Sequence, residues 1–129
     1  MAEEQQKELT TLVVDDDEQI RDLLASAIRR GGIEIIDCVA TTSEGLELIA
    51  KRNYNIIFTD LNQKPSGIEV YKNGTERNSQ VYIITGYAPD AQEAQRIAPD
   101  HLILKPFSGV IIVEIVKDYI QRQNPPSQS

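Results

Sequence analysis

The sequence predicts an α/β domain built on a doubly wound parallel sheet of five strands. Two observations support this fold class. Short runs rich in Val and Ile alternate along the chain with segments of helical period, and several of these runs show no polar alternation. Strands buried on both faces of a parallel sheet have this composition, and regular strand–helix alternation produces such a sheet. The five predicted strands are residues 9–14, 33–40, 56–60, 81–85 and 102–104.

The segments between and after these strands predict five helices. The first has an apolar stripe from Ile20 to Ile28, with Asp17 as its expected cap, and Gly31-Gly32 ends it because glycine accepts a left-handed conformation. The second helix is expected at about 43–52, after a Thr-Thr-Ser start signal. The last helix is predicted by an equivalent stripe from Ile112 to Ile120.

The third and fourth helices are expected to be shortened. Only residues 68–72 separate Gly67 from Asn73-Gly74, a pair that should turn the chain after one or two helical turns. The fourth helix is expected to begin near Pro89, a favourable first-turn residue, and to run to about Ile97.

Length and composition indicate a soluble, cytoplasmic protein. The 129 residues fit one domain, predicted over 9–123, with a disordered tail at 1–8 and a tail or linker at 124–129. The net charge of −7 argues against direct binding to nucleic acid, which needs a basic face. No apolar run approaches the ~20 residues of a membrane span, and the polar start of the chain is not a signal peptide. The single cysteine, Cys38, lies in an apolar run and is expected to be a buried, inert thiol.

Polar residues follow four of the five predicted strands. Asp15-Asp16-Asp17-Glu18 comes after the first strand, Asp60 ends the third, Thr85 ends the fourth, and Lys105-Pro106 follows the fifth. The second strand is followed only by Thr41-Thr42. Ligands of such sheets bind beyond the carboxyl ends of the strands. If the strand order is 2-1-3-4-5, the four polar ends are neighbours along one edge of the sheet.

A cluster of this kind has a definite chemistry. Converging carboxylates repel one another, so they must take up protons or bind a cation, and Mg²⁺ suits carboxylate and phosphate oxygens. A carboxylate beside Mg²⁺ can attack a phosphoryl group and form an acyl phosphate. A lysine ammonium and a threonine hydroxyl can then hold the phosphoryl oxygens. Taken one at a time, each of these residues is more typical of a helix cap, a turn or an exposed surface; their joint placement indicates a phosphoacceptor site.

Four segments resemble the signature segments of response-regulator receiver domains: VVDDDEQIRDLL, IIFTDLN, VYIITGY and LILKPF. The resemblance extends from about Leu9 to Ile120. It implies strand order 2-1-3-4-5 and a role in two-component signal transduction, in which a sensor histidine kinase or a histidine phosphotransfer protein donates the phosphoryl group. It also implies that the domain is not an enzyme acting on other substrates, but catalyses its own phosphotransfer and dephosphorylation.

The resemblance assigns a role to each polar residue. Asp60 would be the phosphoacceptor, with Thr85 and Lys105 holding the phosphoryl oxygens and a cis bond joining Lys105 to Pro106. Asp16 would bind Mg²⁺ directly and Asp15 would assist, through water. Together with Asp60, the main-chain carbonyl of Asn62 would complete the metal ligands.

The chain departs from the family pattern in two places. Gly67 lies seven residues past Asp60, where receivers have a glycine eight residues past the acceptor, so this loop is one residue short. The switch aromatic normally lies three residues before the lysine, where this chain has Leu102. Tyr87 and His101 are possible substitutes, although His101 is expected to be a surface residue.

The start of the last helix carries additional apolar residues, Val110, Ile111 and Val113. They are expected either to be deeply buried or to form a surface for a partner. The resemblance favours a downstream protein or a homodimer that binds through the fourth-to-fifth-helix face.

Two other functions are compatible with parts of the pattern. A Mg²⁺-dependent phosphatase of the haloacid dehalogenase type also forms an aspartyl phosphate, but its nucleophile follows the first strand in an Asp-x-Asp-Gly-Thr pattern, where this chain has Asp-Asp-Asp-Glu-Gln. A phosphate-independent interaction module with the same fold usually lacks the acceptor or the lysine, and both are present here. Nucleotide or flavin binding is poorly supported because no glycine-rich loop follows the first strand.

Overall fold

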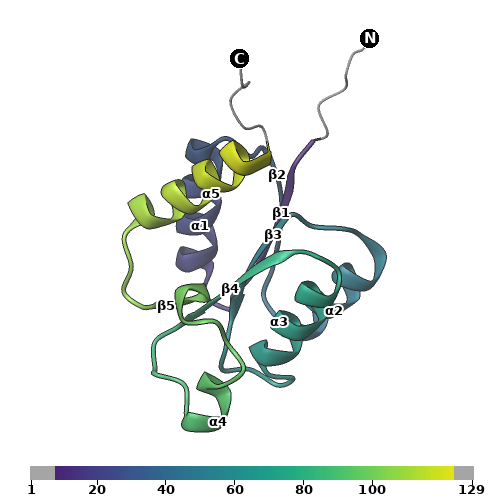
Figure 1. The fold of residues 1–129 in the computed structure, drawn as a ribbon, viewed down its shortest axis with the longest axis vertical. Coiled ribbons are helices and arrows are strands. Elements are labelled where there is room, and N and C mark those ends of the chain that lie inside the picture. Colours follow the sequence, from purple (N-terminus) through teal and green to yellow (C-terminus); the bar gives the residue numbers. More distant parts are fainter. Residues whose placement is uncertain (1–7, 124–129) are drawn as a thin grey trace.

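The structure, a computed structural model, describes residues 8–123. The tails expected at 1–8 (apart from Glu8) and at 124–129 lie outside the described residues. Five parallel strands form one sheet in the order β2-β1-β3-β4-β5, as predicted (Figure 1). The strands are β1 (Thr10–Val14), β2 (Ile35–Val39), β3 (Ile56–Asp60), β4 (Gln80–Thr85) and β5 (Leu102–Leu104).

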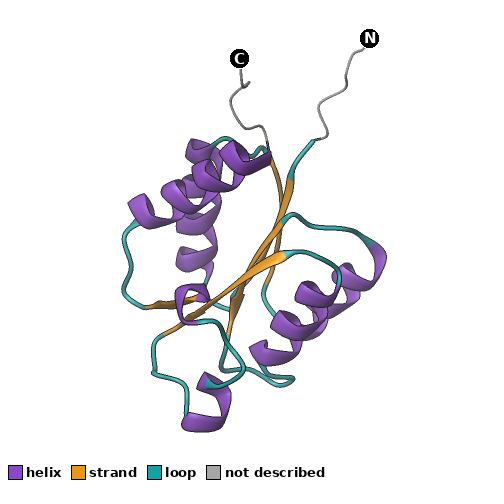
Figure 2. Ribbon diagram, in the orientation of Figure 1, coloured by secondary structure: helices purple, strands orange, loops and turns teal. Residues whose placement is uncertain are grey.

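Helices cover both faces of the sheet (Figure 2). Helices α1 and α5 lie together on one face and α2 and α3 on the other, whereas α4 lies at one end of the molecule (Figure 1). No helix in the described range is long and apolar enough to cross a membrane. The helices are α1 (Glu18–Gly31), α2 (Thr42–Lys51), α3 (Gly67–Glu76), α4 (Ala91–Ala94), the single-turn 3₁₀ helix η1 (Pro99–His101) and α5 (Gly109–Gln123).

The core consists of an apolar layer on each face of the sheet. Successive residues of a strand point to opposite faces, so Val13 packs toward α1 and α5 while Leu12 and Val14 pack toward α2 and α3. Both faces of β1 and β3 are therefore covered, and every residue of β3 is buried. This explains the absence of polar alternation in their sequences, and it gives the residues that follow these strands a rigid base.

Strand β2 differs from the predicted burial because it is the edge strand, paired only with β1. None of its five residues is buried, and Ile35 is 39% exposed. Cys38 is exposed, so the expectation of a buried thiol was wrong. An apolar run shows that a strand is in a sheet, but it does not show that both faces and both edges of the strand are covered.

Helix α3 is longer than the predicted one or two turns and continues through Asn73-Gly74 to Glu76. Its interior glycine permits close packing, since a Cβ on Gly74 would lie 2.7 Å from Val81 Cγ2 and 2.9 Å from Ile57 Cδ1 and these side chains would have to shift. The Asn73 side chain donates a hydrogen bond to the carbonyl of Glu69, one turn earlier. The Asn73-Gly74 pair, which predicted a turn, is therefore helical and lets the helix approach the sheet closely.

Helix α4 is short, as expected, but it spans Ala91–Ala94 and not 89–97. Asp90 caps its start: the Asp90 side chain accepts from the Glu93 N–H and the Glu93 side chain accepts from the Asp90 N–H. None of its four residues is buried, so no packed face extends it. Ile97 leaves the helix and is buried beside Leu61 and Ile83.

The start of α5 exposes apolar side chains. Val110 is 59% and Ile111 is 43% exposed, while Val113 is half-buried, so the deep-burial alternative was wrong for the first two. Ile112 and Val116 carry the contact with the core and are fully buried. The exposed residues follow directly after the loop that leaves the carboxyl end of β5.

Candidate functional site

The carboxyl ends of β1, β3, β4 and β5 bring the predicted polar residues together at one edge of the sheet. Asp15, Asp16 and Asp60 each offer a carboxylate oxygen, and these oxygens all lie within 4.8 Å of one another. Asp15 and Asp60 are buried and Asp16 is exposed, so the cluster has a closed floor and an open side. Asp17, as predicted, caps α1 by accepting from the Gln19 N–H at 2.9 Å.

Asp15 is the most buried carboxylate of this cluster, at 1% exposed. Its Oδ1 accepts a hydrogen bond from the Asp17 N–H at 2.9 Å, and its Oδ2 lies 3.1 Å from Lys105 Nζ. The Arg21 guanidinium donates to the main-chain carbonyl of Asp15 at 2.8 Å. These contacts fix the carboxylate in one orientation, facing the lysine.

Lys105 lies between two carboxylates. Its Nζ is 3.1 Å from Asp15 Oδ2 and 3.9 Å from Asp60 Oδ1. The Lys105 N–H donates to the Thr85 carbonyl at 2.8 Å, which attaches the residue to the end of β4. The bond to Pro106 is cis, as the resemblance implied, and a second cis bond joins Lys64 to Pro65.

The charges at this edge fit a divalent cation. Three carboxylates and one ammonium leave a local charge of about −2 if all are ionised. Oxygen ligands from two or three carboxylates, with one side open to water, suit Mg²⁺, which keeps several waters when it binds to proteins. Asp15, Asp16 and Asp60 are therefore the residues that could hold the metal.

Thr85 lies at the end of β4 with no exposed surface. Its Oγ1 accepts hydrogen bonds from Asn62 Nδ2 at 3.1 Å and from the Tyr87 N–H at 3.2 Å. Both acceptor positions of the hydroxyl are thus occupied, and its hydrogen remains available to donate. The Asn62 side chain therefore links the loop after β3 to the threonine, a contact that was not predicted.

Gln63 was not among the predicted site residues, yet its side chain reaches Asp60. Gln63 Nε2 lies 3.4 Å from Asp60 Oδ2 and 3.0 Å from the Ala40 carbonyl oxygen, and Gln63 Oε1 accepts from the Thr42 N–H at 2.9 Å. A glutamine in a loop gives no signal of such a contact in the sequence. Arg21 was missed as well, although its place in the first turn of α1 puts it within reach of the loop.

The three candidates for the switch residue occupy different environments. Leu102 is half-buried beside the Ile83 cluster, and Tyr87 is 76% exposed. His101 was expected on the surface but is half-buried, with its ring 4.9 Å from that of Tyr82 and 6.2 Å from that of Tyr71. The reason is that β5 begins directly after His101, so the ring lies beside the neighbouring residue of β4.

Burial raises the pKa of the Asp15 carboxyl above its ordinary value of 3.8, although the Asp17 N–H and Lys105 act in the opposite direction. A carboxyl with a raised pKa binds its proton more tightly in the folded chain. The Asp15 carboxyl therefore stabilises the folded chain fully at pH values below 3.8, and this stabilisation is lost as pH rises through the folded-state pKa. We expect the stability of Asp15→Asn relative to the wild type to improve as pH rises above 3.8 in metal-free buffer.

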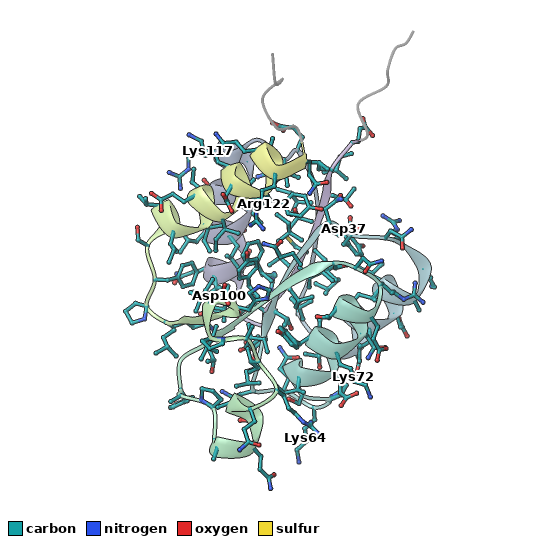
Figure 3. The ribbon with its side chains drawn as sticks, in the orientation of Figure 1. Asp37, Lys64, Lys72, Asp100, Lys117 and Arg122 are labelled. Carbon is teal, nitrogen blue, oxygen red and sulfur yellow. The ribbon has the colours of Figure 1, made fainter. Side chains whose placement is uncertain are left out.

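Urea unfolding followed by far-UV circular dichroism at several pH values measures this difference. The control is Asp100→Asn, at an exposed residue of η1 that is labelled in Figure 3. It should show no such trend. A difference between Asp15→Asn and wild type that is independent of pH would contradict the expectation.

Comparison with known proteins identifies the family of this chain. The family model described as "Response regulator receiver domain" matches residues 11–117. The chain is 32% identical over 131 residues to "Transcriptional regulatory protein ResD" of Bacillus subtilis (strain 168), an alignment that covers 96% of this chain and 53% of the relative. The chain thus spans about half the length of this curated relative.

Solved structures show the same fold. A CheY-like response regulator receiver domain protein from Methanospirillum hungatei JF-1 superposes with a TM-score of 0.76 at 24% identity, covering 91% of this chain and 97% of that one. A response regulator protein from Burkholderia pseudomallei superposes with a TM-score of 0.68 at 23% identity, covering 93% and 77%. Fold, strand order and family model agree, and the chain belongs to the response-regulator receiver domain family.

Proposed function

We propose that this receiver domain accepts a phosphoryl group on Asp60 with the help of Mg²⁺ and thereby switches its binding to a partner. The observation that carries the proposal is the position of Lys105, whose ammonium lies between Asp15 and Asp60 at the edge where three carboxylates converge. A structural ion pair would need one carboxylate. The additional carboxylates and the buried Thr85 hydroxyl are explained by a cation and a phosphoryl group that bind there.

The step is an in-line phosphoryl transfer. An Asp60 carboxylate oxygen attacks phosphorus and forms the new P–O bond, while the bond from phosphorus to the donor nitrogen of a phosphohistidine breaks. The electron pair of that bond stays on the donor nitrogen, and the imidazole leaves as a neutral base when its other ring nitrogen carries a proton. When bound, Mg²⁺ supplies positive charge that offsets the repulsion between carboxylates and phosphoryl oxygens.

Lys105 and Thr85 supply the remaining contacts. The Lys105 ammonium, 3.1 Å from Asp15 and 3.9 Å from Asp60, exchanges a carboxylate partner for a phosphoryl oxygen. The Thr85 hydroxyl, whose hydrogen is not used in its contacts with Asn62 and Tyr87, donates to a second oxygen. Charge-assisted hydrogen bonds of this kind contribute about 1.5–3 kcal/mol each.

One structural neighbour supports this chemistry. The Burkholderia pseudomallei structure contains a phosphorylated aspartic acid and a calcium ion. We extend to this chain only the class of chemistry, an aspartyl phosphate beside a divalent cation. The donor is proposed to be a sensor histidine kinase or a histidine phosphotransfer protein.

The partner surface is proposed to lie on the side of α4, β5 and α5. Four exposed apolar residues occur on these elements or just before them: Tyr87, Leu104, Val110 and Ile111. Tyr87 donates its N–H to the Thr85 hydroxyl, so an inward movement of the threonine would alter the loop that carries this exposed ring. A downstream protein or a second copy of the domain would bind there.

Incubation of the purified chain with Mg²⁺ and a small acyl-phosphate donor tests the proposal. We expect intact-mass spectrometry to show the gain of one phosphoryl group. We expect a chelator to reduce the rate by at least about tenfold, because without the cation the carboxylate and the phosphoryl oxygens repel one another. No mass gain in the presence of Mg²⁺ would refute the proposal and favour a phosphate-independent interaction module.

A further inference from the structure

The side chain of Gln63 connects the candidate phosphoacceptor to the loop between β2 and α2. Its Nε2 contacts Asp60 Oδ2 at 3.4 Å and the Ala40 carbonyl at 3.0 Å, and its Oε1 accepts from the Thr42 N–H at 2.9 Å. The Thr42 hydroxyl donates to the Pro65 carbonyl in the loop after β3. Thr42 has no exposed surface, so the β2–α2 loop and the loop after β3 pack against each other beside Asp60 and exclude solvent there.

The chemistry of these partners allows only one orientation of the Gln63 amide. Its two N–H groups face two acceptors, the Ala40 carbonyl and the Asp60 carboxylate, while its oxygen faces a donor, the Thr42 N–H. A flipped amide would set its oxygen against both acceptors and its N–H groups against the donor. The contact with Asp60 is therefore a donated hydrogen bond, although a long one.

We propose that Gln63 is a positioning residue that stabilises the free Asp60 carboxylate, shortens the lifetime of its phosphorylated form and couples that form to the β2–α2 loop. The inference rests on the proposed function and deepens it. Within the described residues, Lys105 and Gln63 are the side chains with a polar contact to the Asp60 carboxylate, and they approach different oxygens.

The effect on lifetime follows from the hydrolysis step. A water oxygen attacks phosphorus and forms a new P–O bond, while the bond from phosphorus to the Asp60 oxygen breaks and its electron pair returns to the carboxylate. The proton released from the water passes to the phosphate or to solvent. Negative charge on the carboxylate grows during this step, and an N–H donor on one of its oxygens stabilises that charge. The same donor has less to stabilise in the acyl phosphate, which is neutral at the carbonyl.

The coupling to the β2–α2 loop follows from the second half of the amide. When the charge on Asp60 Oδ2 falls, the hydrogen bond from Gln63 weakens and the amide is held mainly by Ala40 and Thr42. The Thr42 N–H then reports the change, because Gln63 Oε1 is its acceptor. Phosphorylation of Asp60 thereby changes the hydrogen bonding at the start of α2, on the face of the sheet opposite to α5.

Gln63→Met removes both donors and the acceptor while nearly preserving side-chain length. After phosphorylation with a small acyl-phosphate donor and Mg²⁺, followed by removal of the donor, we expect the phosphoryl group to be lost about fivefold more slowly than from the wild type. We also expect the amide proton of Thr42 to shift on phosphorylation in the wild type and to shift much less in Gln63→Met, as measured by ¹⁵N–¹H correlation spectra. The matched control is Gln92→Met, at an exposed residue of α4.

Gln63→Glu provides a second variant that retains an acceptor for Thr42. Its carboxylate opposes the charge returning to Asp60, so the phosphoryl group should be lost more slowly than from Gln63→Met. A loss rate for Gln63→Met within about twofold of Gln92→Met, or faster loss from either Gln63 variant than from the wild type, overturns the inference. Absence of phosphoryl uptake by the wild type overturns the proposed function itself, and the inference with it.

Discussion

Asp60→Asn is expected to abolish phosphoryl uptake while the fold is retained. The amide has nearly the shape of the carboxylate, and Asp60 is only 8% exposed, so the isosteric replacement leaves the packing at the end of β3 unchanged. An amide oxygen is far less nucleophilic than a carboxylate oxygen, and the amide also lacks the negative charge that would attract Mg²⁺. We expect the mass gain with Mg²⁺ and an acyl-phosphate donor to fall below about 1% of that of the wild type, as for loss of any nucleophile.

The stability of Asp60→Asn supplies an independent readout. The substitution removes one of three carboxylates that lie within 4.8 Å of one another, and their mutual repulsion is lowered. In metal-free buffer the variant should therefore unfold at a temperature equal to or above that of the wild type. Far-UV circular dichroism measures this directly, since the chain has no tryptophan to serve as a fluorescence probe.

We expect the same carboxylate to make the stability of the wild type respond to Mg²⁺. A ligand that binds only the folded chain raises the free energy of unfolding, by ~2.7 kcal/mol at a concentration one hundred times its Kd. Asp60→Asn should lose most of that increase, whereas Asp100→Asn, at an exposed site, should keep it. An undiminished mass gain in Asp60→Asn would place the acceptor at another residue and contradict the assignment.

Periodicity predicted the fold class, and the resemblance to receiver domains supplied the strand order; together they predicted the convergence of the polar residues. The reason is geometric: parallel strands end at the same edge of the sheet, so residues such as Asp15, Asp60 and Lys105 meet wherever the strands are neighbours. Central strands are covered on both faces, and their composition records this burial. The shared edge of parallel strands and the apolar composition of central strands do not depend on the conformation of the loops.

The features that were not predicted depend on tertiary contacts that have no periodic signature. Cys38 is exposed because β2 is an edge strand; the predicted strand order already placed this strand at an edge, but the apolar run around Cys38 was interpreted as a sign of burial. The Asn73-Gly74 pair remains helical because Gly74 permits contact with Val81, a residue of the next strand. Gln63 contacts Asp60 because of the particular path of the shortened loop. A glutamine at that position does not predict the contact.

Gly67→Ala is expected to destabilise the fold strongly. A Cβ on Gly67 would lie 2.0 Å from the main-chain oxygen of Asp60 and 2.8 Å from the Cα of Leu61. Both atoms belong to the backbone at the end of β3, so no flexible side chain can move aside. The Gly67 N–H also donates to the Leu61 carbonyl at 2.9 Å, and a shift that relieved the clash would weaken this bond.

The expected loss is about 3 kcal/mol or more in the free energy of unfolding, at the upper end of the cost of overpacking. For a domain of this size it corresponds to a fall of roughly 10 °C or more in Tm. The substitution should also affect the site, because the backbone that would be displaced belongs to Asp60, the candidate phosphoacceptor. Phosphoryl uptake by the fraction that remains folded should therefore be slower than in the wild type.

Gly86→Ala is the matched control, since it adds the same methyl group next to Thr85, in another loop of the same site, and its Cβ would meet no atom within 4 Å. Its Tm should remain within a few degrees of that of the wild type, and any difference between the two variants then reflects the contact with the β3 backbone. Urea unfolding of both variants, followed by circular dichroism, gives their free energies of unfolding, and thermal unfolding followed in the same way gives their Tm values. Equal stability of Gly67→Ala and Gly86→Ala would show that α3 can begin further from Asp60, and that the close approach of this loop to the candidate phosphoacceptor is not required by the fold.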